Sequence, residues 1–366
     1  MKHYIFSITL IVAIINCTLP SYSQTAKSGI ENSNNTNDRN DFSFESSPLM
    51  KKLFYPRPQR MAVIGKDINV NGAWGTLNRD FDSLKTGRWF IEEQRSAADA
   101  IIAGIIQDNE AVIERGMMAL EWGAKQQQTD GSFNCSDNFH STSFYVEAVA
   151  HSCILLKRSK YYSLYQERIE KLKTSITNTV NWMLKPEVLV VGKKRNEPYT
   201  HRRYLVAAAI GEAGVLCNNN NFIKQSSLFI YEGLSLQDTA GVNPEKTGYD
   251  CSYQAVGLLF AHRYFDIVAD EKQKEALLLM FEKGFKWLLS RIDENGKVNG
   301  VGNTRTGFGQ EKVRSGKPKG ISFGAIANSL IWWGIYQNDT QLQILAEKVF
   351  TTGRYSQIQQ LPALTK

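Results

Sequence analysis

The stretch RYLVAAAIGEAGVL (residues 203–216) is followed, after a short polar break, by NFIKQSSLFIYEGLSLQ (residues 221–237). In both segments apolar residues recur at the three- and four-residue spacing of a helix, without the alternation of a strand. The first segment is rich in Ala and Gly, as a crowded inner helix would be, whereas the second is longer and more polar. Together they predict a helical hairpin with one inner and one outer helix.

The same pairing recurs along the chain. Four further pairs have this pattern: residues 89–106 with 109–128, 141–157 with 161–184, 252–268 with 272–292, and 321–337 with 340–351. Several second helices end in a turn that places Asp or Asn near a glycine, as at Gly131, Gly241 and Gly296. A supersecondary unit of about 50 to 60 residues that repeats in this way is typical of a helical array.

Five hairpins, with a sixth element that residues 48–85 could supply, predict an all-α fold of the (α/α)5–6 toroid type. The first helices would form an inner ring and the second helices an outer ring. An open solenoid is the alternative, but the number of pairs and the size of the domain favour closure. The loops that lead from outer to inner helices would then share one face and surround a central funnel.

The N-terminus has the pattern of a bacterial secretory signal. Lys2 precedes an apolar run from Tyr4 to about Cys17, and small residues follow up to Ser23, after which we expect cleavage. The run is shorter than the ~20 residues that a membrane span needs. The residue before Cys17 is Asn, where a lipoprotein signal requires a small residue. Residues 1–23 therefore predict export to the periplasm, the cell surface or the medium.

The rest of the chain divides into two parts. Residues 24–47 are rich in Asn and Ser and lack periodicity, which predicts a disordered polar leader. Residues 48–366 are long enough for a single domain with a substantial core, and no stretch in them is apolar for long enough to cross a bilayer.

The charge balance limits the classes of molecule that the protein is expected to bind. The chain has 43 Lys and Arg against 36 Asp and Glu, a net charge of +7, and removal of a signal that contains Lys2 and no acid leaves +6. In an exported protein this mild excess favours an anionic polysaccharide or oligosaccharide over nucleic acid. We expect a monomer.

Four cysteines follow the signal: Cys135, Cys153, Cys217 and Cys251. An even number permits a disulfide in an oxidising compartment, but these are widely spread in a chain large enough to fold without one. No Cys-x-x-Cys or His-x-x-x-His pair occurs. We predict no metal site and no cofactor, and leave open a divalent cation that bridges the protein and an acidic sugar.

The segments that lead into the first helices carry many groups that bind or titrate. The segment PEKTGYDCSYQ (residues 244–254) contributes Glu245, Tyr249, Asp250 and Tyr253. The other segments contribute Arg88, Trp89, Glu93, Asn138, His140, Glu197, His201, Arg202, Arg203 and Arg305. Any one of these could be a helix cap or a core aromatic, but their recurrence at successive helix starts favours a site. Helix N-termini also present free N–H groups to anions.

β-Elimination from a uronate would use such residues. A base removes the proton beside the carboxylate, whose charge must be neutralised, and the glycosidic oxygen leaves with a proton. We assign Tyr253 as base or acid, His140 or His201 as its partner, and Asp250 as the group that orients them. The substrate-binding candidates are Arg202, Arg203, Asn138, Tyr249, Trp89, Arg88, Glu245 and Arg305.

Two alternatives remain open. Hydrolysis needs two carboxyl groups that flank the scissile bond, and Asp250 with Glu93, Glu197 or Glu245 could supply them. The same aromatic and basic residues could also hold a glycan without cleaving it. Bases outnumber acids at the helix starts, so we rank the lyase first.

The signal, the paired helices, the DGSF-type turn at residues 130–133 and the Tyr, His and Arg residues at the helix starts resemble secreted bacterial α/α-toroid carbohydrate-active enzymes. These are the alginate-lyase-like polysaccharide lyases and the unsaturated uronyl hydrolases. The resemblance covers most of residues 50–355 and implies a toroid fold and action on uronate glycans. The Asn-His pair of such lyases is interrupted here, because Phe139 separates Asn138 from His140.

Overall fold

The computed structural model describes residues 44–55, 89–307, 311–312, 316 and 318–359, and of residues 354–359 the backbone alone. These residues belong to one compact unit of the chain, residues 40–366. The predicted signal, Arg88 and residues 56–85 of the predicted sixth element lie outside the described residues.

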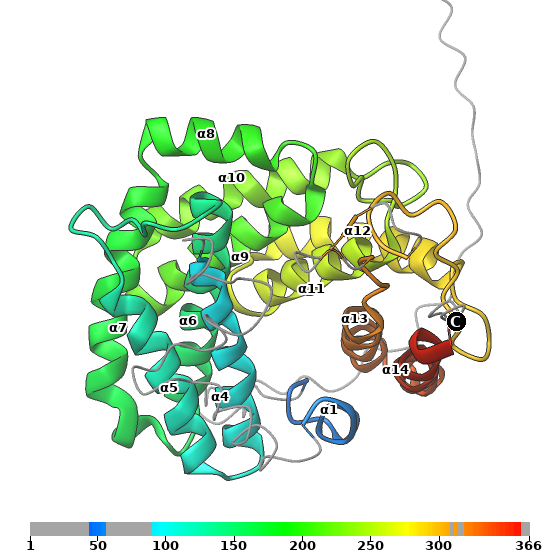
Figure 1. Cartoon of the computed structure of the whole chain (residues 1–366), viewed down its shortest axis with the longest axis horizontal. Coiled ribbons are helices and arrows are strands. Elements are labelled where there is room, and N and C mark those ends of the chain that lie inside the picture. Colours follow the sequence, from blue (N-terminus) through cyan, green and yellow to red (C-terminus); the bar gives the residue numbers. More distant parts are fainter. Residues whose placement is uncertain (1–43, 56–88, 308–310, 313–315, 317, 360–366) are drawn as a thin grey trace, which may run out of the picture. The chain divides into compact units, whose positions relative to one another are not determined.

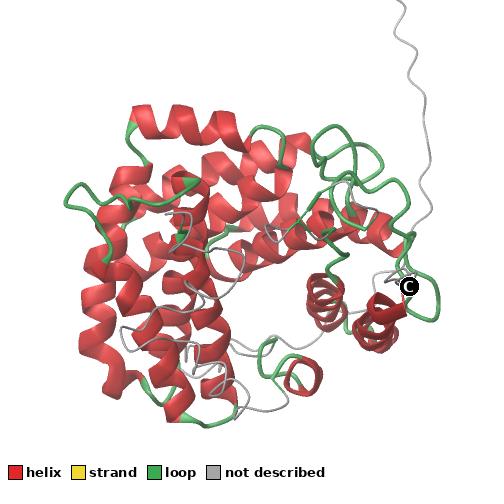
Figure 2. Cartoon of the chain, viewed as in Figure 1, coloured by secondary structure: helices red, strands yellow, loops and turns green. Residues whose placement is uncertain are grey.

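The all-α prediction is confirmed: the described residues form helices and a few isolated bridges but no strand (Figure 2). Ten helices form the five predicted hairpins: α4 (Ser96–Ile106) with α5 (Glu110–Lys125), α6 (Asn138–Lys157) with α7 (Tyr162–Met183), α9 (Thr200–Cys217) with α10 (Asn220–Leu236), α11 (Cys251–Ile267) with α12 (Glu271–Leu289), and α13 (Phe323–Tyr336) with α14 (Thr340–Gln359).

Three further elements were not distinguished by periodicity. They are α1 (Pro48–Leu53), the 3-10 helix η2 (Ile91–Arg95) directly before α4, and α8 (Pro186–Asn196). The break between α7 and α8 has a local cause. Pro186 disfavours helical backbone at the preceding residue, and Lys185 adopts an extended ψ of 133°. Pro186 then occupies the first turn of α8, where no backbone N–H is needed.

The two helices of a hairpin are buried to different extents, as predicted. Of the 18 residues of α9, 15 are buried, because neighbouring helices cover it nearly all round. The more polar α10, which at 17 residues is no longer than α9, buries only a stripe at helical spacing that includes Phe222, Phe229 and Ile230. The first helices therefore supply the core, and the second helices cover it.

The first helices contact one another in chain order (Figure 1). α4 packs against α6, α6 against α9, α9 against α11, and α11 against α13. Each of them also packs against the second helix of its own hairpin, and α1 contacts both α13 and α14. The N-terminal ends of the first helices are thereby brought near one another, which is what positions the site below.

Glycine allows the turns after the second helices to approach the next hairpin. Gly131, Gly241 and Gly296 have φ values of 91°, 92° and 81°. A Cβ atom on Gly241 would lie 2.3 Å from the carbonyl oxygen of Lys283 in α12, and the other two glycines meet the following second helix just as closely. The recurrence of one close contact at three turns explains the repeat that is visible in the sequence.

The described contacts begin before residue 48. Ser47 caps α1, since its hydroxyl accepts a hydrogen bond from the backbone N–H of Met50 at 3.3 Å. Phe44, within the predicted leader, lies edge-on to His262 at a ring-centroid distance of 5.2 Å. The four cysteines are free thiols. No helix among the described residues is both long enough and apolar enough to cross a bilayer.

Candidate functional site

A cavity of about 680 Å³ lies at the N-terminal ends of the first helices. Its lining comes from η2, α4, α6, α9, α11 and the segment that leads into α13. Five predicted site residues line it together: His140, His201, Arg202, Tyr253 and Arg305. Residues more than 150 positions apart in the chain therefore share one pocket.

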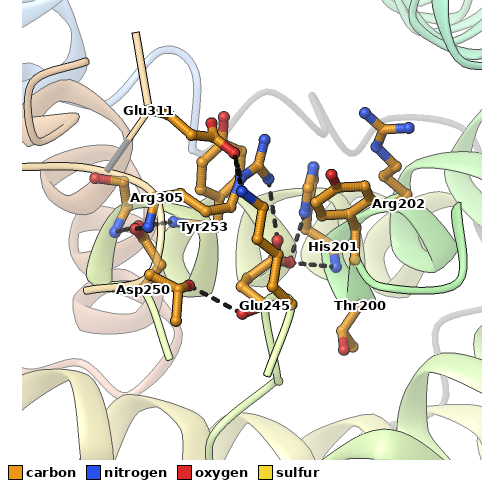
Figure 3. A network of polar contacts seen from close by, with 12 residues as sticks. Thr200, His201, Arg202, Glu245, Asp250, Tyr253, Arg305 and Glu311 are labelled. Atoms are coloured by element: carbon orange, nitrogen blue, oxygen red, sulfur yellow. Dashed lines mark hydrogen bonds and ion pairs between the residues drawn. The ribbon is translucent and has the colours of Figure 1, made fainter. Parts of the chain in front are cut away.

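Tyr253 lies among positively charged groups (Figure 3). The guanidinium carbon of Arg305 is 3.5 Å from the centroid of the Tyr253 ring, and the ammonium of Lys319 donates to the phenolic oxygen. The His201 ring is 4.6 Å from the Tyr253 ring, centroid to centroid. Negative charge that develops on the phenolic oxygen would be stabilised by both cations.

Glu245 connects two of these groups from beneath the pocket. Its Oε1 lies 2.6 Å from His201 Nδ1 and accepts the backbone N–H of His201 at 3.1 Å, while its Oε2 accepts from Arg305 at 3.0 Å. Burial alone would raise the pKa of Glu245, but His201 and Arg305 outweigh it and the pKa is lowered. An ionised Glu245 keeps the proton of a neutral His201 on Nδ1 and leaves Nε2 as an acceptor.

Burial also sets the charge of the two histidines. It lowers the pKa of His201, although Glu245 opposes the shift. It lowers the pKa of His140 well below the ordinary value, and Arg202 and His201 add to the effect. Both imidazoles are therefore neutral at pH 7, and each can donate or accept a proton.

Two groups that line the pocket have unused hydrogen-bonding atoms. The Nε of Arg202 and the Nδ1 of His140 are buried and have no hydrogen-bond partner among the described residues. Arg202 stacks on Tyr199, with its guanidinium carbon 4.4 Å from the ring centroid. Buried polar atoms are rarely left unpaired, so these two indicate where a ligand or water binds.

The Glu311 carboxylate interacts with three cationic side chains, two of which contact Tyr253. It accepts from Arg305 at 2.9 Å and from Lys246 at 2.8 Å, and Lys319 lies 3.5 Å away. Burial would raise the pKa of Glu311, but these partners lower it to about 2. Sequence analysis missed this residue. The available signal was a lone acid in a strongly basic loop, residues 302–320.

Asp250 caps α11 and does not line the pocket. Its Oδ1 accepts the backbone N–H groups of Ser252 at 3.0 Å and of Tyr253 at 3.1 Å. Its Oδ2 accepts those of Arg305 at 3.0 Å and of Thr306 at 2.7 Å. With both oxygens engaged, Asp250 joins the start of α11 to the loop that carries Arg305.

The other predicted binding residues point elsewhere. Arg203 is buried and donates to backbone carbonyls between α8 and α9. Tyr249 donates to a backbone carbonyl at 2.9 Å, Trp89 does so at 2.6 Å, and Asn138 accepts from a hydroxyl one turn later in α6 at 3.1 Å. None of these four lines the pocket. Of the acids considered for hydrolysis, Glu93, Glu197 and Glu245 do not line it either.

The pocket has its own acids, which sequence analysis missed. Asp99 in α4 and Glu147 in α6 line it below the helix starts, as does Arg263 in α11, whose guanidinium pairs with Glu147. Phe144 and Phe260 add apolar surface, and Arg95 lies 4.4 Å over the Phe144 ring. These residues sit inside helical patterns, where a core position is the default interpretation.

Comparison with protein-family models, with curated proteins and with solved structures finds no match. The function that the pocket supports therefore follows from its own residues. The pocket combines a phenol between two cations, neutral imidazoles, and a guanidinium with an unpartnered donor, all at helix starts that favour anions.

Proposed function

We propose that the protein is an exported polysaccharide lyase that cleaves a uronate-containing polysaccharide or oligosaccharide by β-elimination. The observation that carries the proposal is the position of Tyr253, whose phenolic oxygen accepts from Lys319 and whose ring lies against Arg305 and His201. A tyrosine in these surroundings suits proton abstraction from a weak carbon acid.

The carboxylate of the sugar would bind on the α6 and α9 side of the pocket. Arg202 offers a guanidinium with an unpartnered Nε, and His140 offers a neutral imidazole with an unpartnered Nδ1. Hydrogen bonds and a positive charge at the carboxylate stabilise the enolate-like charge that forms after proton removal. Both groups line the pocket, and the positive charge of Arg202 contributes to the lowered pKa of His140.

The elimination then balances as follows. The Tyr253 phenolate takes the proton from the carbon beside the carboxylate, and the electron pair of that C–H bond forms the new C=C bond. The glycosidic C–O bond breaks, and the leaving oxygen takes from Tyr253 the proton that Tyr253 has just accepted. The products are a chain with a new hydroxyl group and a chain that ends in an unsaturated uronate.

Asp250 and Glu245 would act as positioning residues in this scheme. Asp250 fixes the backbone of Tyr253 and Arg305, and Glu245 fixes the side chains of His201 and Arg305. Neither lines the pocket.

Hydrolysis is the second candidate function. One observation favours it, but with a pair of acids that differs from the pairs predicted with Asp250. Asp99 and Glu147 both line the pocket. The surrounding protein and Glu147 raise the pKa of Asp99, although Arg263 opposes the shift and Asp99 itself is exposed. Glycoside hydrolysis requires two carboxyl groups, one to give a proton and one to act as base or nucleophile, and these two share the pocket.

We also propose the finer architecture and location that the lyase assignment implies. The chain-order contacts of the first helices support an α/α toroid, and the secretory pattern of residues 1–23 supports export of a monomer. Small-angle scattering of the purified protein tests the toroid and the monomer together, because an open solenoid or a dimer would have a larger radius of gyration.

The experiment that tests the function mixes the purified protein with a panel of uronate polysaccharides, including alginate, glucuronans, pectins and glycosaminoglycans. Rising ultraviolet absorbance from a conjugated unsaturated uronate supports elimination and identifies the substrate class. New reducing ends without absorbance would replace the lyase with a hydrolase that acts through Asp99 and Glu147. Binding of a glycan with neither signal would leave a glycan-binding protein.

A further inference from the structure

A second polar cluster lies deeper in the layer of first helices. Glu147 and His151 are one turn apart on α6, and Glu212 lies on the neighbouring α9. All three side chains are buried, with Glu212 0% and His151 2% exposed. His151 Nδ1 is 3.2 Å from Glu212 Oε2. Ionisable groups buried to this extent are costly unless something compensates them.

The spacing of the donor atoms is close to that of a metal site. One imidazole nitrogen and one oxygen from each carboxylate lie within 4.8 Å of one another. Ligands at about 2.0 to 2.2 Å from a tetrahedral ion are about 3.3 to 3.6 Å apart, so small side-chain rotations would complete the geometry. Residues four apart on a helix, such as Glu147 and His151, present their side chains on one face and commonly bind one ion together.

Two atoms of the cluster have no hydrogen bond in the part of the chain that the structure describes. They are Glu212 Oε1 and His151 Nε2, both fully buried. Glu147 retains an oxygen as well, because Arg263 pairs with Oε1 alone. A buried carboxylate oxygen without a donor points to a cation or an unseen proton at that position.

The charges point to a cation. Glu147 and Glu212 belong to this cluster, and Glu45 lies next to His151. Among the described residues, the guanidinium paired with the cluster is that of Arg263, which pairs with Glu147. Three carboxyl groups therefore face one guanidinium, an excess of acidic groups that a divalent ion would offset.

We propose that Glu147, His151 and Glu212 bind a divalent transition-metal ion, with Zn²⁺ as the best match to one imidazole and two carboxylates. Mg²⁺ and Ca²⁺ prefer six or more oxygen ligands and fit this donor set poorly. Glu147 also lines the pocket, but the metal site takes no part in the proposed elimination and does not depend on it.

Residues 44–47 supply the contact that is expected at the second ring nitrogen of a metal-binding histidine. Glu45 Oε1 lies 3.7 Å from His151 Nε2. A histidine that binds a metal through one nitrogen usually donates its other N–H to a carboxylate, which orients the ring. Metal bound at Nδ1 would therefore draw Glu45 towards Nε2 and fasten residues 44–47 to α6 and α9. The ion would act as a structural clamp.

The test uses untagged protein that has been treated with a chelator and dialysed. We expect elemental analysis to find one Zn²⁺ per chain after reloading, and a Tm about 5 °C higher at a free Zn²⁺ concentration 100-fold above Kd. Glu212→Gln and His151→Gln should abolish both effects. His262→Gln, a buried histidine outside the trio, is the matched control and should retain them.

Three results would overturn the site: no bound Zn²⁺ in the wild-type protein, no rise in its Tm, or binding that persists in both variants. If the two variants do not fold, X-ray absorption of the Zn²⁺-loaded wild-type protein decides. One imidazole with carboxylate oxygens as ligands supports the site. Sulfur ligands, or oxygen ligands alone, contradict it.

Discussion

Asp250 accepts a hydrogen bond from the backbone N–H of Tyr253 with one oxygen and from that of Arg305 with the other, and the Arg305 guanidinium lies 3.5 Å from the Tyr253 ring centroid. One helix cap therefore fixes two residues that are 52 positions apart in the sequence. Asp250 holds the backbones of Tyr253 and Arg305 but does not line the pocket, so mutation can separate the role of the cap from that of the proposed catalytic group.

Replacement of Tyr253 by Phe should reduce kcat at least 1,000-fold with little change in Tm, because the base is lost while the ring contacts remain. Initial rates of unsaturated-uronate formation measure the effect. Tyr249→Phe is the control. Its hydroxyl donates to the carbonyl of Val301 outside the pocket, so turnover should stay within about threefold of wild type. Equal activity in the two variants would remove Tyr253 from the reaction.

Asp250→Asn should lower Tm and kcat together. The amide can still accept at one oxygen, but its NH₂ group would face the N–H groups of Arg305 and Thr306. Loss of a helix cap costs about 1 to 2 kcal/mol, and the displaced loop would lower kcat by about 10- to 100-fold. Thermal unfolding and steady-state rates check both effects. Full loss of activity at an unchanged Tm would contradict the role of Asp250 as a cap and positioning residue.

Glu245→Gln should be strongly destabilising. It removes the fully buried carboxylate between His201 and Arg305, and loss of one partner of a buried ion pair costs about 3 to 5 kcal/mol. Urea denaturation measures the free energy of unfolding. Glu232→Gln is the control. Glu232 itself is partly exposed, and Arg203 keeps its backbone acceptors, so the change should cost less than ~1 kcal/mol.

Stability should fall as the pH rises in the metal-free protein. Burial lowers the pKa of His151, but Glu212 and Glu45 outweigh it and raise the pKa to about 9. Because the folded pKa exceeds the unfolded value of ~6.5, roughly 3 kcal/mol of stability is present below pH ~6.5 and is lost as the pH approaches 9. Urea denaturation between pH 6 and 9.5 should show this slope.

The His151→Gln variant should flatten the slope between pH 6.5 and 9. His262 gives a contrast of opposite sign. Burial lowers its pKa well below the ordinary value, so its cost appears as the pH falls below ~6.5. His262→Gln should therefore leave the alkaline slope intact, and an identical alkaline slope in wild type and His151→Gln would contradict the assignment.

Gly241→Ala should cost more than Gly316→Ala, although φ is positive at both residues, 92° and 82°. A Cβ atom on Gly241 would lie 2.3 Å from the Lys283 carbonyl oxygen, whereas nothing lies within 4 Å of a Cβ atom on Gly316. Positive φ alone costs alanine about 1 kcal/mol, and the steric clash should at least double that cost at Gly241. Similar Tm values for the two variants would show that the turn adapts.

Local pattern was sufficient to predict the helices. The ten paired helices lie where the three- and four-residue spacing of apolar side chains predicts them. Residues at this spacing share one face of a helix, and that face is buried. The pattern missed α8, which is separated from α7 by the conformational preference of the residue before Pro186. Prediction also placed His140, His201, Arg202, Tyr253 and Arg305 at one site, since helix starts on one side of paired helices come together.

Other parts of the site could not be predicted. Arg203 and Arg202 are adjacent in sequence, yet only Arg202 faces the cavity, because consecutive helix residues point about 100° apart and the packing of α9 selects the direction. Lys319 reaches Tyr253, and Glu311 reaches Lys319, only through the path of a long loop.

The sequence by itself determined the all-α class, the hairpin repeat and the residue types gathered at the helix starts, because these follow from local periodicity and chain order. Only the tertiary structure decided that Asp250 is a cap, that Asp99 and Glu147 face the pocket, and that Glu147 and His151 meet Glu212. Such meetings depend on how helices rotate and pack against one another, and that is settled by the sum of many distant contacts.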